Sequence, residues 1–356
     1  MNAEDGSRRS RPWGAWAVTL GLGAGGGGVF AALGLPLPWM LGAITATTAV
    51  AVAGGRLDVA GPLRVGMIGV LGVMLGSAFH TEMLDQMVHW WPSLCGLLAY
   101  VLVSTLVVAA WLRRVVGYDP VTAWFSAAPG GLNQMILMGG ALGGDDRVIA
   151  LSHGIRILLV VFTVPAAFAL LAGYERPDGG AAGIGAAWDG IALIDAGWLV
   201  GCGVIGVLGA RALNIPAGML IGPMALSALV HGLGWTASHP PALAVAAAQV
   251  VVGSGIGARF SGVPARAVAR VFLASIGSTA VLLGITVAFA GALSLVTSLP
   301  PRELILAYAP GGVVEMSLVS LALGVDVAFV STHHIARILL IVLLAPLAVR
   351  LSGRPQ

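Results

Sequence analysis

The sequence of 356 residues contains few charged side chains, which make up 9% of it against about 25% in soluble domains. Hydrophobic residues account for 58%, and the mean hydropathy is +0.96. A soluble fold of this size could not cover so much apolar surface with 18 basic and 15 acidic side chains, whereas a lipid bilayer solvates it. The composition therefore predicts an integral membrane protein whose surroundings are the bilayer.

Lysine is absent, so all 18 basic residues are Arg, and most of them lie in short loops between apolar runs. This is the pattern of a membrane topology signal and not of a nucleic-acid-binding surface, so we expect no nucleic-acid partner. Cysteine occurs only at Cys95 and Cys202, which excludes a disulfide framework and a thiolate metal site. The seven His residues are scattered except for the pair His333 and His334, and we expect neither a metal nor a cofactor.

Twelve apolar runs are long enough, at about 17–25 residues, to be candidate membrane segments. They lie near 14–33, 37–55, 63–80, 92–112, 120–143, 148–172, 191–210, 216–233, 241–259, 268–292, 302–324 and 329–349. The sequence therefore predicts an all-α membrane protein with a long break between two halves. The expected parts are an N-terminal tail (1–12), a first membrane repeat (13–172), a linker (173–190), a second membrane repeat (191–350) and a C-terminal tail (351–356).

The two halves are related in sequence. The stretch from Ala128 to Met135 returns 181 residues later as Ala309 to Met316, and at the same offset His153 corresponds to His334. Over 128–167 there are 18 identities in 40 positions, far more than a shared bias toward Leu, Ala and Gly would produce. The chain is therefore an internal duplication.

The Arg positions predict how the repeats are oriented, because cytoplasmic loops collect positive charge. If all twelve runs crossed the membrane, five of the sixteen loop Arg residues would lie outside the cell. If the two runs that contain Pro-Gly-Gly enter and leave on one side, fourteen lie inside and two outside. The second arrangement predicts inverted repeats of about five transmembrane helices, each with a Pro-Gly-Gly broken or re-entrant segment, and both termini in the cytoplasm.

The Pro-Gly-Gly motifs predict interrupted helices, because Pro removes a backbone donor and Gly-Gly weakens the helix. Broken backbone at membrane depth is tolerated where it is buried in protein or lines a cavity, and paired broken helices mark substrate sites in secondary transporters. The plainer alternative is a Pro kink with Gly for close helix packing. The motif residues are candidate substrate-binding residues: Pro129, Gly130, Gly131, Pro310, Gly311 and Gly312.

Each repeat also carries a His and an Arg three residues apart on one helix, so that they share a face. Arg156 and Arg337 lie deep in apolar runs and should point into the protein. They either contact an anionic substrate or clamp the carbonyls of the broken segments, with Asp145 and Asp326 as further partners. His153 and His334 have either a structural role or a part in proton transfer.

Polar residues follow each Pro-Gly-Gly directly. Asn133 and Gln134 in the first repeat and Glu315 in the second are candidates for substrate binding. Glu315 is also a candidate proton or cation carrier, because it is the only acidic residue well inside an apolar run. The alternative is a carboxylate that caps its own half-helix.

The duplicated Pro-Gly-Gly stretch with its downstream Arg helix, together with the stretch from Ile215 to Met224, resembles the bacterial membrane family called AbrB. The resemblance extends from about Trp13 to Leu351 and implies an inner-membrane protein of transporter-like, inverted-repeat type. Members of this family carry labels such as ammonia monooxygenase or regulator of gene expression. The resemblance supplies no catalytic residues.

Three functions are therefore weighed. The first is a secondary transporter of a small anionic, carboxylate-type solute. The second is a membrane regulator or sensor that affects gene expression indirectly. The third, a membrane monooxygenase, is disfavoured because the sequence has no cluster of metal ligands, so we expect no enzyme. Gly-rich outer helices also suggest a homodimer.

Overall fold

The structure, a computed structural model, describes residues 12–79, 87–171 and 191–351. These ranges consist of helices and connecting loops and contain no β-strand, so the predicted all-α class is confirmed. The predicted tails and linker lie outside the described residues, apart from Pro12 and Leu351. The first part of the chain forms α1 (Pro12–Ala32), α2 (Pro38–Val52), α3 (Gly61–Gly76), η1 (Val88–Trp90), α5 (Trp91–Trp111), η2 (Leu112–Val116), α6 (Pro120–Ala127), α7 (Leu132–Ala141) and α8 (Asp146–Leu171).

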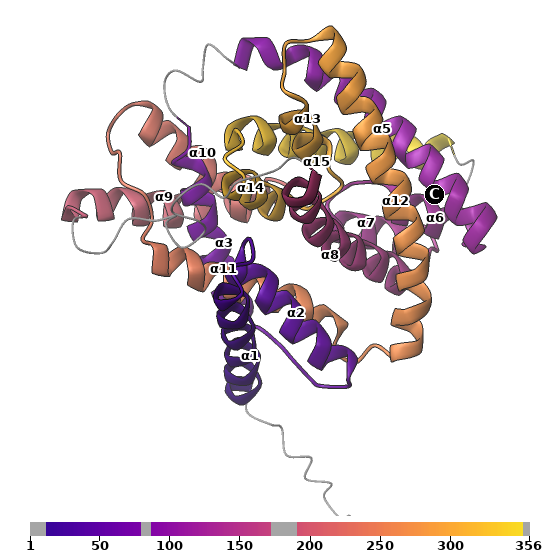
Figure 1. Cartoon of the computed structure of the whole chain (residues 1–356), viewed down its shortest axis with the longest axis horizontal. Coiled ribbons are helices and arrows are strands. Elements are labelled where there is room, and N and C mark those ends of the chain that lie inside the picture. Colours follow the sequence, from indigo (N-terminus) through magenta and orange to yellow (C-terminus); the bar gives the residue numbers. More distant parts are fainter. Residues whose placement is uncertain (1–11, 80–86, 172–190, 352–356) are drawn as a thin grey trace, which may run out of the picture.

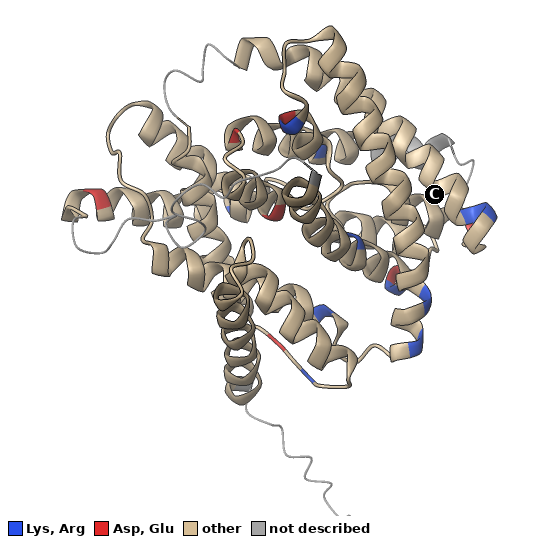
Figure 2. Cartoon of the chain, in the orientation of Figure 1, with Lys and Arg blue, Asp and Glu red and all other residues tan. Residues whose placement is uncertain are grey.

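The second part repeats this order with similar lengths. It forms α9 (Leu193–Ala212), α10 (Gly218–Gly232), α11 (Ala242–Gly257), η3 (Ala258–Phe260), α12 (Ala265–Val296), α13 (Pro301–Tyr308), α14 (Val313–Ala322) and α15 (Val327–Leu351). Six helical stretches in the described ranges are long and apolar enough to cross a membrane. Shorter apolar helices, with 10–16 residues, are α2, α3, α10 and α14. Charged residues are sparse along the helices of both parts of the chain (Figure 2).

The backbone at the start of the second helix of each half has the same unusual shape. Leu37 and its counterpart Ala217 both adopt positive φ angles, 45° and 53°, immediately before α2 and α10. Three residues earlier, Gly34 and Asn214 also have positive φ angles, which Gly and Asn tolerate best. Each preceding Pro prevents helix continuation, so the chain turns sharply between two closely packed helices.

The helices form two groups (Figure 1). The first group packs α1, α2 and α3 against α9, α10 and α11, and its contacts are reciprocal: α3 packs on α10, and α11 packs on α2. The second group contains α5 to α8 and α12 to α15, with α5 against α12 and α8 against α12. Contacts between the groups run mainly through α2, α3, α8, α14 and α15. Each group therefore combines corresponding helices from both halves of the chain.

Candidate functional site

The helix is interrupted at both Pro-Gly-Gly motifs. α6 ends at Ala127 and α7 begins at Leu132, while α13 ends at Tyr308 and α14 begins at Val313. Each pair of half-helices doubles back. The backbone amide of Asp145, just after α7, donates a hydrogen bond of 2.8 Å to Thr122 Oγ1 in the first turn of α6. In the second half, Glu303 near the start of α13 lies within electrostatic reach of Asp326 after α14.

The first turn of α6 is held by a side-chain cap. The carboxylate of Asp119 accepts hydrogen bonds of 3.0 Å from the backbone amides of Val121 and Thr122. Partial burial raises the pKa of this carboxyl, but its hydrogen bonds outweigh the effect and hold the pKa below its usual value. Asp119 is therefore charged at neutral pH, which suits a helix N-terminus.

Arg337 closes the break in the second half. Its Nη1 donates to the carbonyl of Ala309 and its Nη2 to the carbonyl of Gly311, both at 2.6 Å. These carbonyls have no partner within α13 because Pro310 and the two glycines end the helix. Arg337 is 3% exposed, so a guanidinium supplies donors that water cannot supply there.

Arg156 does the same in the first half with longer bonds. Its two terminal nitrogens lie 3.2–3.4 Å from the carbonyl oxygens of Ser126, Ala127 and Ala128. These contacts are those of the carbonyl clamp considered from the sequence. In both Arg residues Nε is buried without a hydrogen-bond partner, so each keeps one donor free.

The two His residues extend the clamps, and their partners define the tautomer. Nδ1 of His153 lies 2.9 Å from Nη2 of Arg156, and because Arg only donates, this nitrogen accepts. Nε2 therefore carries the proton and donates to the carbonyl of Phe125 at 2.8 Å. His334 repeats this pattern with Arg337 and the carbonyl of Leu306, at 2.9 and 3.0 Å. Both rings are neutral in this arrangement, which fits the structural alternative better than proton transfer.

The two Asp residues do not extend the clamps. Asp145 Oδ1 accepts from the backbone amides of Arg147 and Val148 at 3.0 Å, and Asp326 Oδ1 accepts from those of Ala328 and Phe329. Each carboxylate is thus the N-cap of its long helix, α8 or α15.

The polar residues after the breaks fold back on their own half-helices. The carboxylate of Glu315 lies against Gly312, and the amide of Gln134 lies against Gly131 in the same way. In each case a Glu or Gln at the third helical position reaches the residue before the helix, as in a capping box. Glu315 is buried and within electrostatic reach of Arg259. The side chain of Asn133 lies outside the described residues.

The two breaks approach one another. A Cβ added at Gly130 would lie 2.8 Å from Ile341, one turn beyond Arg337 on α15. Arg156 and Arg337 are within electrostatic reach of each other, and the buried Tyr100 on α5 is within reach of both. The structure therefore brings together Gly130, Arg156 and Arg337 from opposite halves of the chain.

A cavity of about 860 Å³ adjoins the first break and is strongly basic. Its wall includes the first turn of α7 at Leu132, and it lies between α3 of one helix group and α7, α8 and α12 of the other. The charged residues that line it are one acidic residue, Asp145, and four basic ones, Arg64, Arg147, Arg259 and Arg270. The sequence analysis assigned these Arg residues to loops and did not propose them as a site. The sequence shows the positive charge of these residues but not that they lie together, because they come from distant parts of the chain.

The corresponding positions in the other half carry no Arg. At the offset of 181 residues they are Val245, Ala328, Ala78 and His89. The two repeats therefore differ at these four positions, and the residues that correspond to the cavity's Arg residues form no second cluster of Arg. Among the described residues, no group of three or more His, Cys, Asp and Glu side chains is close enough to hold a metal ion.

Residues 39–353 match the family described as transition state regulatory protein AbrB. The chain belongs to this family. YhjN of Bacillus subtilis (strain 168) is 27% identical to it over 356 aligned positions, covering 92% of this chain and 90% of YhjN. A protein of Escherichia coli (strain K12) named as a regulator, AbrB, is 23% identical over 321 positions, covering 90% of this chain and 91% of that protein. The family expected from the duplicated motif is thereby confirmed. The described residues of this member form helices and loops, and six of the helical stretches are apolar and long enough to cross a membrane.

Proposed function

We propose that this AbrB-family protein is a secondary transporter of a small carboxylate-type anion in a bacterial inner membrane. The observation that carries the proposal is the basic cavity at the start of α7, which is lined by four Arg residues and one Asp. Arg binds carboxylates through two parallel donors, and a half-helix N-terminus adds free amides and a positive dipole. The Arg residues of this cavity are thus added to the candidate binding residues expected from the sequence; the cavity itself lies beside the first Pro-Gly-Gly motif.

The cavity also supports inverted repeats with re-entrant segments. If all twelve apolar runs crossed the membrane, Arg64 would lie on the side opposite Arg147, Arg259 and Arg270. These four residues line one cavity, which favours the arrangement in which each Pro-Gly-Gly hairpin enters and leaves on one side. In that arrangement ten helices span the membrane, both termini are cytoplasmic, and the cavity opens to the cytoplasm.

The position of the cavity supports alternating access. It lies between two helix groups that contact each other through a limited set of helices, so one group can rock against the other around a bound solute. In this mechanism the clamped half-helices keep their broken ends rigid, and Glu315 is the candidate carrier of a coupling proton or cation. The proposal assigns the chain no chemical reaction.

A second candidate function is a membrane sensor that acts on gene expression indirectly, which the name of the Escherichia coli relative favours. A sensor would bind the same anion in the same cavity but would not move it. Binding and uptake measured side by side distinguish the two.

The test uses the full chain in detergent and in proteoliposomes. Carboxylates with one, two and three charges are screened by thermal shift, and the best binder is then tested for uptake. Arg64→Gln and Arg259→Gln should each lower affinity about ten-fold or more, since a hydrogen bond to a charged group contributes about 1.5–3 kcal/mol. Arg266→Gln is the matched control, because Arg266 is exposed on α12 outside the cavity wall. Affinity that is equal in all three variants would refute the site, and binding without uptake would favour the sensor.

A further inference from the structure

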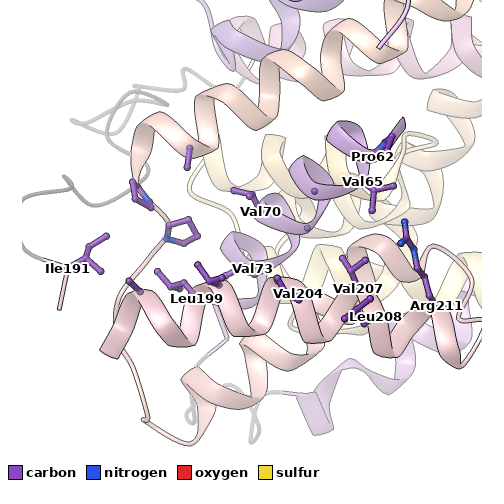
Figure 3. Close-up of a pocket in the computed structure, with 18 residues that line it drawn as sticks. Pro62, Val65, Val70, Val73, Ile191, Leu199, Val204, Val207, Leu208 and Arg211 are labelled. Carbon is purple, nitrogen blue, oxygen red and sulfur yellow. The ribbon is translucent and has the colours of Figure 1, made fainter. Parts of the chain in front are cut away.

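A second cavity, of about 570 Å³, lies between α3 and α9 and is almost entirely apolar. Val, Leu, Pro, Gly, Ala and Ile side chains line it from both helices and from the start of α11. Among the described residues in its wall, Arg211 is the only charged one. Figure 3 shows Arg211 beside Pro62 and Val65 at one end and Ile191 at the opposite end.

The shape of the cavity limits what can occupy it. Its wall runs along α9 from Ala196 to Arg211, which at 1.5 Å per residue is about 22 Å, roughly three quarters of a bilayer core of about 30 Å. The groove is long enough and apolar enough to hold an extended hydrocarbon chain.

The cavity is open toward the surroundings of the protein. Val200, Val204 and Leu208 line it and are 65%, 54% and 57% exposed. Arg211 lies in the last turn of α9, where a membrane-spanning helix reaches the head-group region, and its side chain is exposed. A guanidinium in that position offers two parallel donors to a phosphate.

The corresponding helix pair in the first half lacks the cation. There Gly23 of α1 packs directly on Ser254 and Val250 of α11, and the counterpart of Arg211 is Ala31. The cation of this groove thus occurs at only one of two corresponding positions in a duplicated sequence.

We propose that the groove between α3 and α9 binds an anionic phospholipid, with an acyl chain along α9 and the phosphate on Arg211. Membrane proteins use basic pockets between helices in this way for anionic head groups. The site is separate from the proposed solute cavity, and lipid binding there does not depend on the transport proposal.

The test measures lipid binding to the detergent-purified full chain by native mass spectrometry, with phosphatidylglycerol and phosphatidylcholine. Arg211→Gln should lower the affinity for phosphatidylglycerol about five-fold, as expected for one basic residue near anionic lipid, and abolish the preference over phosphatidylcholine. Gly203→Leu fills the groove, because an added Cβ meets only Val73 at 3.7 Å, and should lower the binding of both lipids. Gly66→Leu tests the opposite wall, where an added Cβ meets nothing within 4 Å.

Gly201→Leu is the matched control on the same helix. An added Cβ there meets nothing within 4 Å, and Gly201 does not line the groove, so lipid binding should equal that of the unmodified protein. The proposal is wrong if both groove-filling variants bind the two lipids normally. It is also wrong if they change the oligomeric state while lipid binding stays constant, since the groove would then be a protein contact.

Discussion

At the scale of single residues, the two buried Arg residues make the contacts of the carbonyl clamp, one of the two alternatives that the sequence left open. Their terminal nitrogens are occupied by carbonyls at the helix breaks and by a neutral His, while each Nε has no partner. A buried charge in an apolar run predicts that some partner exists, but not which one. The partner could not be read from sequence because the carbonyls become free only once the preceding helix ends.

Replacement of either Arg by Lys should destabilise the protein more than it weakens solute binding. A single ammonium on a flexible stem cannot reach two carbonyls and a His nitrogen together, so buried carbonyls lose donors at about 1.5–3 kcal/mol each. Arg337→Lys should lower the melting temperature more than Arg156→Lys, because its bonds are shorter, 2.6 Å against 3.2–3.4 Å. Melting curves and solute affinity are measured on both variants. Unchanged melting with lost affinity would instead make these residues solute ligands.

At the scale of helices, the duplicated sequence predicted much of what the structure contains. The interruptions after Ala127 and Tyr308 follow from Pro-Gly-Gly. The basic cavity did not follow, because the side chains that form it come from segments up to about 200 residues apart. Their convergence depends on how α3, α8 and α12 pack, which no local pattern encodes.

Close helix contacts through glycine provide a prediction at this scale. A Cβ on Gly206 of α9 would lie 2.7 Å from the carbonyl carbon of Gly222 on α10 and still closer to Pro223. Gly206→Ala should therefore force the helices apart and lower the melting temperature by at least about 2 °C, since overpacking costs about 1–3 kcal/mol. Gly209→Ala is the control on the same helix, where an added Cβ meets nothing within 4 Å. There the better helix propensity of Ala should leave stability equal or slightly higher. Equal melting of the two variants would show that the α9–α10 contact tolerates extra volume.

At the scale of the whole molecule, the duplication yields pseudo-symmetric packing with an asymmetric charge distribution. α3 packs on α10 as α11 packs on α2, yet the four Arg residues of the cavity correspond to Val, Ala, Ala and His in the other half. A pseudo-symmetric helix packing with a single cluster of cavity Arg residues is suited to attract an anion from one side of the membrane. Sequence analysis placed these Arg residues on the cytoplasmic side from their number alone, and the cavity adds a reason for their position besides topology.

The sidedness of the cavity is therefore the prediction that tests the whole arrangement. Single Cys residues at positions 64, 147 and 270, in a background in which Cys95 and Cys202 are replaced by Ser, should all react with a membrane-impermeant maleimide from the cytoplasmic side. A Cys at position 302 should react only from the opposite side, because in inverted repeats Arg302 precedes a hairpin that enters from there. The labelling is compared in intact cells and in inverted vesicles. If position 64 reacts from one side and position 147 from the other, the first Pro-Gly-Gly segment crosses the membrane, and the inverted, re-entrant arrangement is wrong.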